Sequence, residues 1–180
     1  MSRPSLARAA ALAVLAALLA PLATACGGGD GAPATAGTTA PPATGATVTV
    51  YFVDDAGGLV AEPRPAPLGE SPLEAAVRAL AEGPSDPALV PALPPGTRLL
   101  GAGVAGGVAT LDLSREFESG YPSAGSAAEL AVLGPLVRTA SEAAGTERVR
   151  ILVEGRAPAP PDSQFDLSQP LSPGDVAAAG

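Results

Sequence analysis

Hydrophobic and polar residues alternate on both sides of the pair Gly106-Gly107, a pattern that predicts two short strands joined by a tight turn. Glycine adopts the positive φ angles of a primed two-residue turn without a Cβ penalty, so residues equally distant from this turn should face each other. In that register Leu100 meets Leu113, and Leu111 lies on the same apolar face. A slip by one residue would expose leucines at about 1.5–3 kcal/mol each, so the pattern also predicts the register.

Upstream of this hairpin, residues 47–53 predict another strand because they are β-branched or aromatic and alternate in polarity. Residues 59–60 can form a short returning strand. Proline cannot donate to a strand ladder, so Pro63, Pro65 and Pro67 should forbid regular structure beyond that point.

Ser71, Pro72 and Glu74 predict the start of a helix, with a hydroxyl N-cap, a proline at the first helical position and the glutamate of a capping box. Apolar residues then recur at helical spacing until Gly83-Pro84 ends the helix. The proline-rich residues 83–97 follow, and we interpret them as a rigid connection, with a functional loop as the alternative.

A second helix is predicted from Ser126, which repeats the capping pattern with Glu129 and is followed by an apolar stripe that ends at Gly145. Pro135 lacks an N–H and its ring crowds the preceding turn, so a kink or break is expected there. Residues 148–154 alternate as a last strand, and residues 165–171 should pack as an irregular closing arm.

These elements favour an α+β fold, a two-layer α/β sandwich of βαββαβ type with two helices on one face of a four-stranded sheet. The opposite face would be open to solvent or to a partner. It would carry the side chains of Thr49, Tyr51, Thr110, Asp112, Arg148 and Arg150.

The N-terminal residues 1–25 are typical of a secretory signal peptide, with basic residues, a short apolar run and small residues before the sole cysteine, Cys26. The apolar run is too short to span a bilayer comfortably. Residues 26–45 are rich in Gly, Ala, Pro and Thr and predict a disordered tether with a reach of roughly 25 Å. One domain should occupy residues 46–172, followed by a frayed tail over 173–180.

Charge and composition narrow the classes of partner. Without Arg3 and Arg8 of the signal peptide, eight arginines stand against 18 acidic residues, a net charge of −10, and no lysine occurs. Such a surface argues against binding nucleic acid or anionic lipid, so membrane attachment would have to come from lipid on Cys26.

Histidine and lysine are absent and Cys26 is the only cysteine, which excludes serine triads, Ser-Lys dyads and histidine-ligated zinc. No cofactor or metal is expected. The carboxylate pairs Asp54-Asp55 and Glu116/Glu118 are candidates for acid–base work or Ca²⁺, but their positions favour solvated surface. Residues 114–117, Ser-Arg-Glu-Phe, are interpreted as a structural exit turn, with a contact site as the alternative.

Several segments of the chain together resemble the GerMN domain, which is named for a sporulation and spore germination lipoprotein. These are Val48–Val53, the helix after Ser71-Pro72, Leu93–Leu100, Gly107–Ser114, Glu147–Gly155 and Asp166–Leu171. The resemblance implies a fold like that of the ring-building modules of secretion and sporulation assemblies, and an extracytoplasmic lipoprotein role. It supplies no catalytic motif. The region around Cys26 likewise resembles the bacterial lipoprotein processing site, which implies a diacylated mature N-terminus.

The leading hypothesis is a non-enzymatic interaction module anchored by lipid on Cys26 to the outer face of the cytoplasmic membrane, where it helps to organise envelope proteins. A carboxylate-based hydrolase of cell-wall polymer and a small-ligand binder are the alternatives. For the interaction module, we expect an envelope protein partner to dock on the outer sheet face around Thr110, Asp112 and Arg150, where the neighbouring Gly101 and Gly103 permit close approach.

Overall fold

Eight elements appear in the computed structural model, which describes residues 44–122 and 126–177. They follow the order β1 (Thr44–Val53), β2 (Leu59–Pro67), α1 (Pro72–Glu82), β3 (Leu99–Ala105), β4 (Val108–Leu113), α2 (Glu116–Ser119), α3 (Ser126–Ala144) and β5 (Arg148–Val153). The expected signal peptide and nearly all of the tether lie outside the described residues. Among the helices that are described, none is both long enough and apolar enough to cross a bilayer.

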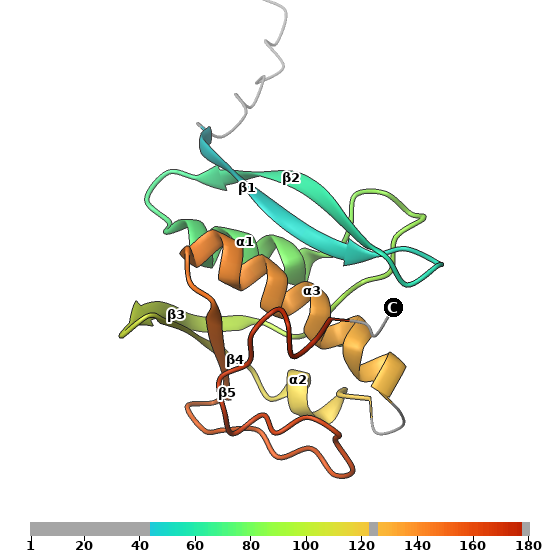
Figure 1. Ribbon diagram of the computed structural model, residues 1–180. Helices are drawn as coiled ribbons and strands as arrows, with labels where there is room; N and C mark the ends of the chain where they lie inside the picture. Colours follow the sequence, from blue (N-terminus) through green and yellow to red (C-terminus); the bar gives the residue numbers. More distant parts are fainter. Residues whose placement is uncertain (1–43, 123–125, 178–180) are drawn as a thin grey trace, which may run out of the picture. The chain divides into compact units, whose positions relative to one another are not determined.

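The strands form two separate sheets, one with the order β1-β2 and one with the order β3-β4-β5. Helices α1 and α3 contact each other, β1 and strands of the second sheet, and Figure 1 shows them between the two sheets. The α+β class is therefore confirmed, but the expected two-layer sandwich with a single four-stranded sheet is wrong. Thr49 and Tyr51, expected on the open face beside Thr110, belong to the other sheet.

The helices can be covered on two sides because each buries more than a single stripe. In α1 the alanines beside the predicted stripe are buried as well, and in α3 the buried positions run almost without interruption from Leu133 to Ser141. A helix that is apolar over most of its circumference needs cover from more than one direction. The two sheets provide that cover.

Strand β2 runs through the prolines that were expected to exclude it. It pairs antiparallel with β1 along its length, with Pro63 opposite Thr49 and Pro65 opposite Thr47. Alternate residues of an antiparallel strand point their N–H groups away from the partner, and β2 lies at the edge of its sheet. Prolines at every second position therefore cost no ladder hydrogen bond, so the expectation was wrong.

The predicted hairpin is confirmed with its register from Ala105↔Val108 to Gly101↔Asp112. Leu111 and Leu113 are fully buried, as the apolar face requires. The register shifts between Leu99 and Gly101, so that Leu99 rather than Leu100 lies opposite Leu113. Leu100 is left 53% exposed, which corrects the expected pairing.

Strand β5 adds to β4 in parallel, with Ala109 opposite Val149, Leu111 opposite Ile151 and Leu113 opposite Val153. All of these side chains are buried. The alternation predicted for residues 148–154 is therefore confirmed, because the residues between them on β5 are more exposed.

The predicted caps of α1 are confirmed. The Ser71 hydroxyl accepts a hydrogen bond from the Glu74 backbone N–H at 3.2 Å, and the Ser71 N–H donates to the Glu74 carboxylate at 3.1 Å. At the other end Gly83 has a φ of 91° and its N–H donates to the carbonyl of Leu80.

Helix α3 continues through Pro135 from Ser126 to Ala144, so of the expected kink or break, the break does not occur. It ends in a Schellman motif, in which the N–H of Thr146 donates to the carbonyl of Ser141 while Gly145 adopts a φ of 63°. The expected capping pattern of Ser126 and Glu129 lies outside what the structure describes, but the carboxylate of Glu129 itself is placed. It is 1% exposed and accepts the backbone N–H of Gln164, at 3.1 Å to Oε2.

The closing arm packs as predicted, without regular structure. Leu167 and Leu171 are buried, and Leu171 exchanges two backbone hydrogen bonds of 2.8 Å with Val149. The expected frayed tail begins with described residues: Ser172 caps a turn through Asp175, and Val176 is only 4% exposed. This first part of the tail is packed against the domain.

Candidate functional site

The three residues expected to contact a partner lie together on the outer face of the β3-β4-β5 sheet. Thr110 is the register partner of both Gly103 and Arg150, and Asp112 lies two positions further along β4, opposite Gly101. Positions two apart on a strand share a face. Thr110 and Asp112 are half-buried and Arg150 is exposed.

This outer face is shallow and has little side-chain cover. A depression of about 340 Å³ lies over β3 and β4, lined in part by Thr110 and Asp112. A Cβ added at Gly101 or Gly103 would meet no atom within 4 Å. One Asp112 carboxylate oxygen accepts the N–H of Gly155 at 2.8 Å, which fixes the side chain beside the depression. The face thus offers close approach to the backbone with one fixed acidic and one exposed basic side chain.

Two of the four candidate catalytic carboxylates accept hydrogen bonds from backbone N–H groups. Asp54 accepts the N–H groups of Ala56 and Gly58 at 3.0 and 2.8 Å, which forms the β1–β2 turn. Glu118 accepts the N–H of Ala159 at 3.0 Å. Over residues 44–122 and 126–177, no group of three acidic or other metal-ligating side chains is placed to hold a metal ion.

Residues 114–117 form the exit from β4 into α2. The N–H of Ser114 donates to the carbonyl of Arg98 at 2.9 Å, and the Ser114 hydroxyl accepts the N–H of Arg98 at 3.0 Å. Phe117 is fully buried and lies against Tyr121, with ring centres 5.6 Å apart. These contacts fit the structural interpretation, although the Arg115 side chain projects into solvent.

The proline-rich loop is held by a side chain that sequence reasoning did not single out. The Glu62 carboxylate on β2 accepts the N–H groups of Ser85 and Asp86, both at 3.1 Å, and pairs with Arg64. Partial burial raises the pKa of Glu62, but the hydrogen bonds from Ser85 and Asp86 and the Arg64 charge outweigh it, so the pKa is lowered overall. Arg64 in turn donates to the carbonyl of Gly83. The loop is thus rigidly tied to β2.

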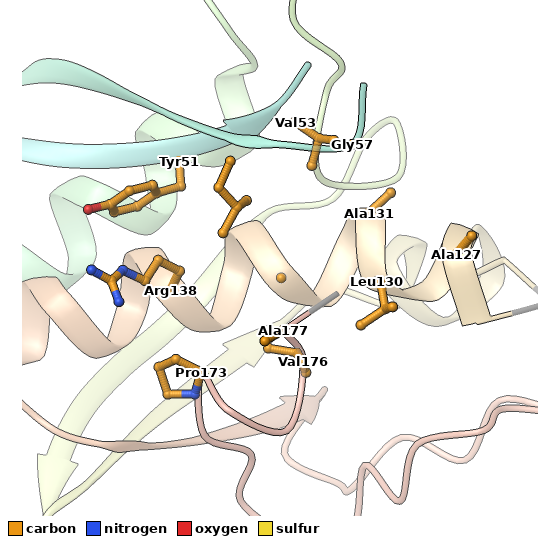
Figure 2. Close-up of a pocket in the computed structure, with 12 residues that line it drawn as sticks. Tyr51, Val53, Gly57, Ala127, Leu130, Ala131, Arg138, Pro173, Val176 and Ala177 are labelled. Atoms are coloured by element: carbon orange, nitrogen blue, oxygen red, sulfur yellow. The ribbon is translucent and has the colours of Figure 1, made fainter. Parts of the chain in front are cut away.

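A second surface feature, which sequence reasoning missed, is a groove of about 680 Å³ between β1, the β1–β2 turn, α3 and the C-terminal segment (Figure 2). Its lining is mostly apolar and includes Val53, Leu130 and Val176. At its polar end Figure 2 shows Tyr51 of β1 facing Arg138 of α3.

The polar end is a network of three side chains. The Tyr51 hydroxyl donates to Glu142 at 2.6 Å, and the Arg138 guanidinium lies 5.3 Å from the centre of the Tyr51 ring and 3.6 Å from the Glu142 carboxylate. The hydrogen bond to Glu142 and partial burial raise the pKa of Tyr51. The only sequence signal was the spacing of Arg138 and Glu142, which places them on one side of a helix. Nothing local linked them to Tyr51.

Comparison with solved structures gives likenesses at the level of the fold. The first GerMN domain of the sporulation protein GerM from Bacillus subtilis matches with 22% identity and a TM-score of 0.58, over 73% of this chain and all of that domain. The tandem GerMN domains of the same protein match at 21% identity and a TM-score of 0.58, over 77% of this chain and 49% of theirs.

A protein from Clostridium perfringens, provisionally described as a lipoprotein, matches with 25% identity and a TM-score of 0.51, over 77% of this chain and 95% of its own. No curated protein sequence matches. The Germane family model, described as sporulation and spore germination, matches residues 49–158, from β1 to just beyond β5. Because the match spans more than half of the chain and includes both sheets and both long helices, this chain belongs to the Germane (GerMN-domain) family of sporulation and spore germination proteins.

Proposed function

We propose that this chain is an extracytoplasmic lipoprotein that carries one non-enzymatic GerMN module and takes part in an envelope, sporulation or germination assembly. Lipid on Cys26 anchors it to the outer face of the cytoplasmic membrane. Family membership and the likeness to the Clostridium perfringens protein support this proposal. The basic, apolar and small-residue series that ends at Cys26 is independent support from the sequence.

The observation that carries the interaction role is the outer face of the β3-β4-β5 sheet. The helices cover the other face of this sheet, whereas Thr110, Asp112 and Arg150 point outward beside two glycines that permit close approach. Charged groups at such a face set the register and orientation of a partner more than they set affinity. An envelope protein with a flat, polar surface of complementary charge fits this face.

The double variant Asp112→Arg/Arg150→Glu tests the docking face, because it inverts both charges. Co-purification of a membrane partner from crosslinked cells should be lost, while the thermal midpoint changes little. Asp55→Arg/Arg115→Glu is the matched control, since it makes the same charge changes at two exposed positions away from that face. Partner recovery with the folded Asp112/Arg150 variant at the level of the control would exclude this surface.

The groove beside Tyr51 supports a second candidate, binding of a small amphipathic ligand. Its apolar lining would accept a hydrocarbon portion, and Arg138 at its polar end would accept an anionic group. A medium-chain fatty acid is a suitable probe. Ala131→Phe should fill the groove and abolish any increase in the thermal midpoint that the probe produces; the candidate fails if the unmodified protein shows no such increase.

A further inference from the structure

The two sheets have four outer edges, and three of them are closed by identifiable devices. On β2, Pro63 and Pro65 occupy positions whose nitrogen points away from β1 and remove the donors that another strand would need. On the free edge of β1, the N–H of Tyr51 donates to the Thr139 hydroxyl at 3.0 Å and the carbonyl of Val53 accepts the N–H of Val90 at 2.8 Å.

The free edge of β5 is closed by the chain that follows it. Val149 exchanges two hydrogen bonds with Leu171, and the N–H of Val153 donates to the carbonyl of Arg156 at 2.7 Å. Unpaired edges readily accept other chains, and natural proteins usually block them with prolines, charges or covering segments. Such protection is therefore the rule in this domain.

The fourth edge, that of β3, has no such device beyond Gly101; before that point Glu74, Arg78 and Glu82 line a depression together with Leu99–Gly101. Its sequence, Leu99–Ala105, contains neither a charged residue nor a proline. Across the two-residue turn Ala105 and Val108 form a hydrogen-bonded pair, so the alternation along the ladder points the N–H and C=O groups of Ala102 and Val104 outward. Within residues 44–122 and 126–177, no partner outside the hairpin bonds to the backbone of β3 between Leu99 and Ala105.

We propose that the β3 edge pairs antiparallel with the β3 edge of a second copy of this chain, joining two three-stranded sheets into one. The twofold axis passes between the two Gly103 residues. Ala102 then lies opposite Val104 of the other copy, and each of these pairs exchanges two backbone hydrogen bonds. All the outward-pointing groups of Ala102 and Val104 are satisfied in this register.

Self-pairing is favoured by the side chains of the strand itself. Gly103 falls at a non-hydrogen-bonded position, where opposed backbones come closest and a residue without a side chain fits best. Val104, 52% exposed in the single chain, gains an apolar neighbour in Ala102 of the other copy. The chain as a whole carries a net charge of −8, but the paired strand itself, Leu99–Ala105, carries no charge.

Disulfide trapping tests the register in the full-length chain with Cys26→Ser, which removes the native thiol. In this background Gly103→Cys should give a disulfide-linked dimer under mild oxidation, because opposed residues at the axis have Cα atoms about 4.5 Å apart. Gly101→Cys is the matched control: it lies on the same strand and face, and both glycines have open space around an added Cβ. In the proposed register its two copies are about 13 Å apart along the strands and should not join.

Sedimentation equilibrium in detergent tests the pairing without a crosslink. The unmodified chain should approach twice its monomer mass as concentration rises. Val104→Lys places a charge on the edge and should weaken the dimer about tenfold or more, whereas Val104→Thr keeps the N–H and the branched shape and should leave it nearly unchanged. Circular dichroism checks that both variants remain folded.

A chain that stays monomeric at all concentrations would overturn the proposal, as would a dimer that Val104→Lys leaves intact. Crosslinking of Gly101→Cys to Gly103→Cys, without self-crosslinking of Gly103→Cys, would overturn the register. The pairing is independent of the proposed docking function, since Asp112→Arg/Arg150→Glu lies on the sheet face and should not alter the dimer. A variant that loses partner binding but keeps the dimer, or the reverse, distinguishes the docking proposal from the pairing proposal.

Discussion

The Tyr51 hydroxyl on β1 donates a 2.6 Å hydrogen bond to Glu142 on α3, 91 residues further along the chain. This bond joins the two-stranded sheet to the longest helix. A second bond from the Tyr51 N–H to the buried Thr139 hydroxyl reinforces the joint. An isolated two-stranded ribbon is marginal in water, so the packing of β1 on α3 is what makes the first sheet stable.

Removal of the Tyr51 hydroxyl should weaken this joint. Tyr51→Phe should lower the free energy of unfolding by about 1 kcal/mol, since it deletes one charge-assisted hydrogen bond at a partly exposed site. Glu142→Gln should have a smaller effect, because its amide oxygen can still accept the bond. Denaturant unfolding at neutral pH measures both variants, and a larger loss from Glu142→Gln than from Tyr51→Phe would show that the Arg138–Glu142 ion pair, rather than the tyrosine bond, is the stabilising contact.

Tyr121 should make stability depend on alkaline pH. Burial raises its pKa from 10.0 to about 12, so the folded state holds the phenolic proton more tightly than the unfolded state does. Its contribution is fully present below pH 10 and is lost as the pH rises from 10 to about 12, by up to about 3 kcal/mol. The raised pKa of Tyr51 acts in the same direction.

Tyr121→Phe tests this assignment because the phenylalanine keeps the ring against Phe117 and cannot ionise. The Tyr121 hydroxyl has no hydrogen-bond partner among the described residues, so its removal should cost little at neutral pH. The decline of the unfolding free energy above pH 10 should become shallower. An unchanged alkaline profile would assign the decline to other groups.

The hairpin register predicts a large difference between two neighbouring residues. Leu111 is fully buried in the core, so Leu111→Ala should lower the free energy of unfolding by about 2–5 kcal/mol. Thr110 lies on the outer face, and Thr110→Ala should cost under about 1 kcal/mol. Equal losses measured by urea unfolding would contradict the register.

Lipid attachment at Cys26 remains a prediction from the sequence. Cys26→Ser should move the protein from the membrane fraction to the medium or block its processing, because a diacylated cysteine is the only strong anchor that the predicted leader supplies. Fractionation and intact mass of the membrane form measure this. If the unmodified protein and Cys26→Ser show the same distribution between membrane and medium, and the mass of the unmodified protein includes no lipid, the anchor is not on Cys26.

Elements that depend on near neighbours could be predicted from the sequence alone. The capping box of Ser71 and Glu74 and the Gly106-Gly107 turn act over a few residues, and both are confirmed. The outer-face positions of Thr110, Asp112 and Arg150 followed from the same alternation. The bulge that leaves Leu100 exposed could not be predicted, since either leucine at 99 or 100 satisfies the apolar pattern.

Tertiary structure alone decided how the elements combine. Pro63 and Pro65 argue against a strand in the sequence, but β2 is an edge strand in which their nitrogens point outward and need no partner. One apolar stripe per helix likewise does not reveal that α1 and α3 are covered by two sheets. The groove and the Tyr51–Glu142 bond join residues far apart in sequence. Periodicity and capping are short-range properties, so they determined most of the secondary structure and the exposed faces of β4 and β5. The choice between one sheet and two depends on which burial arrangement covers all the apolar surfaces together, and only the folded chain settles that.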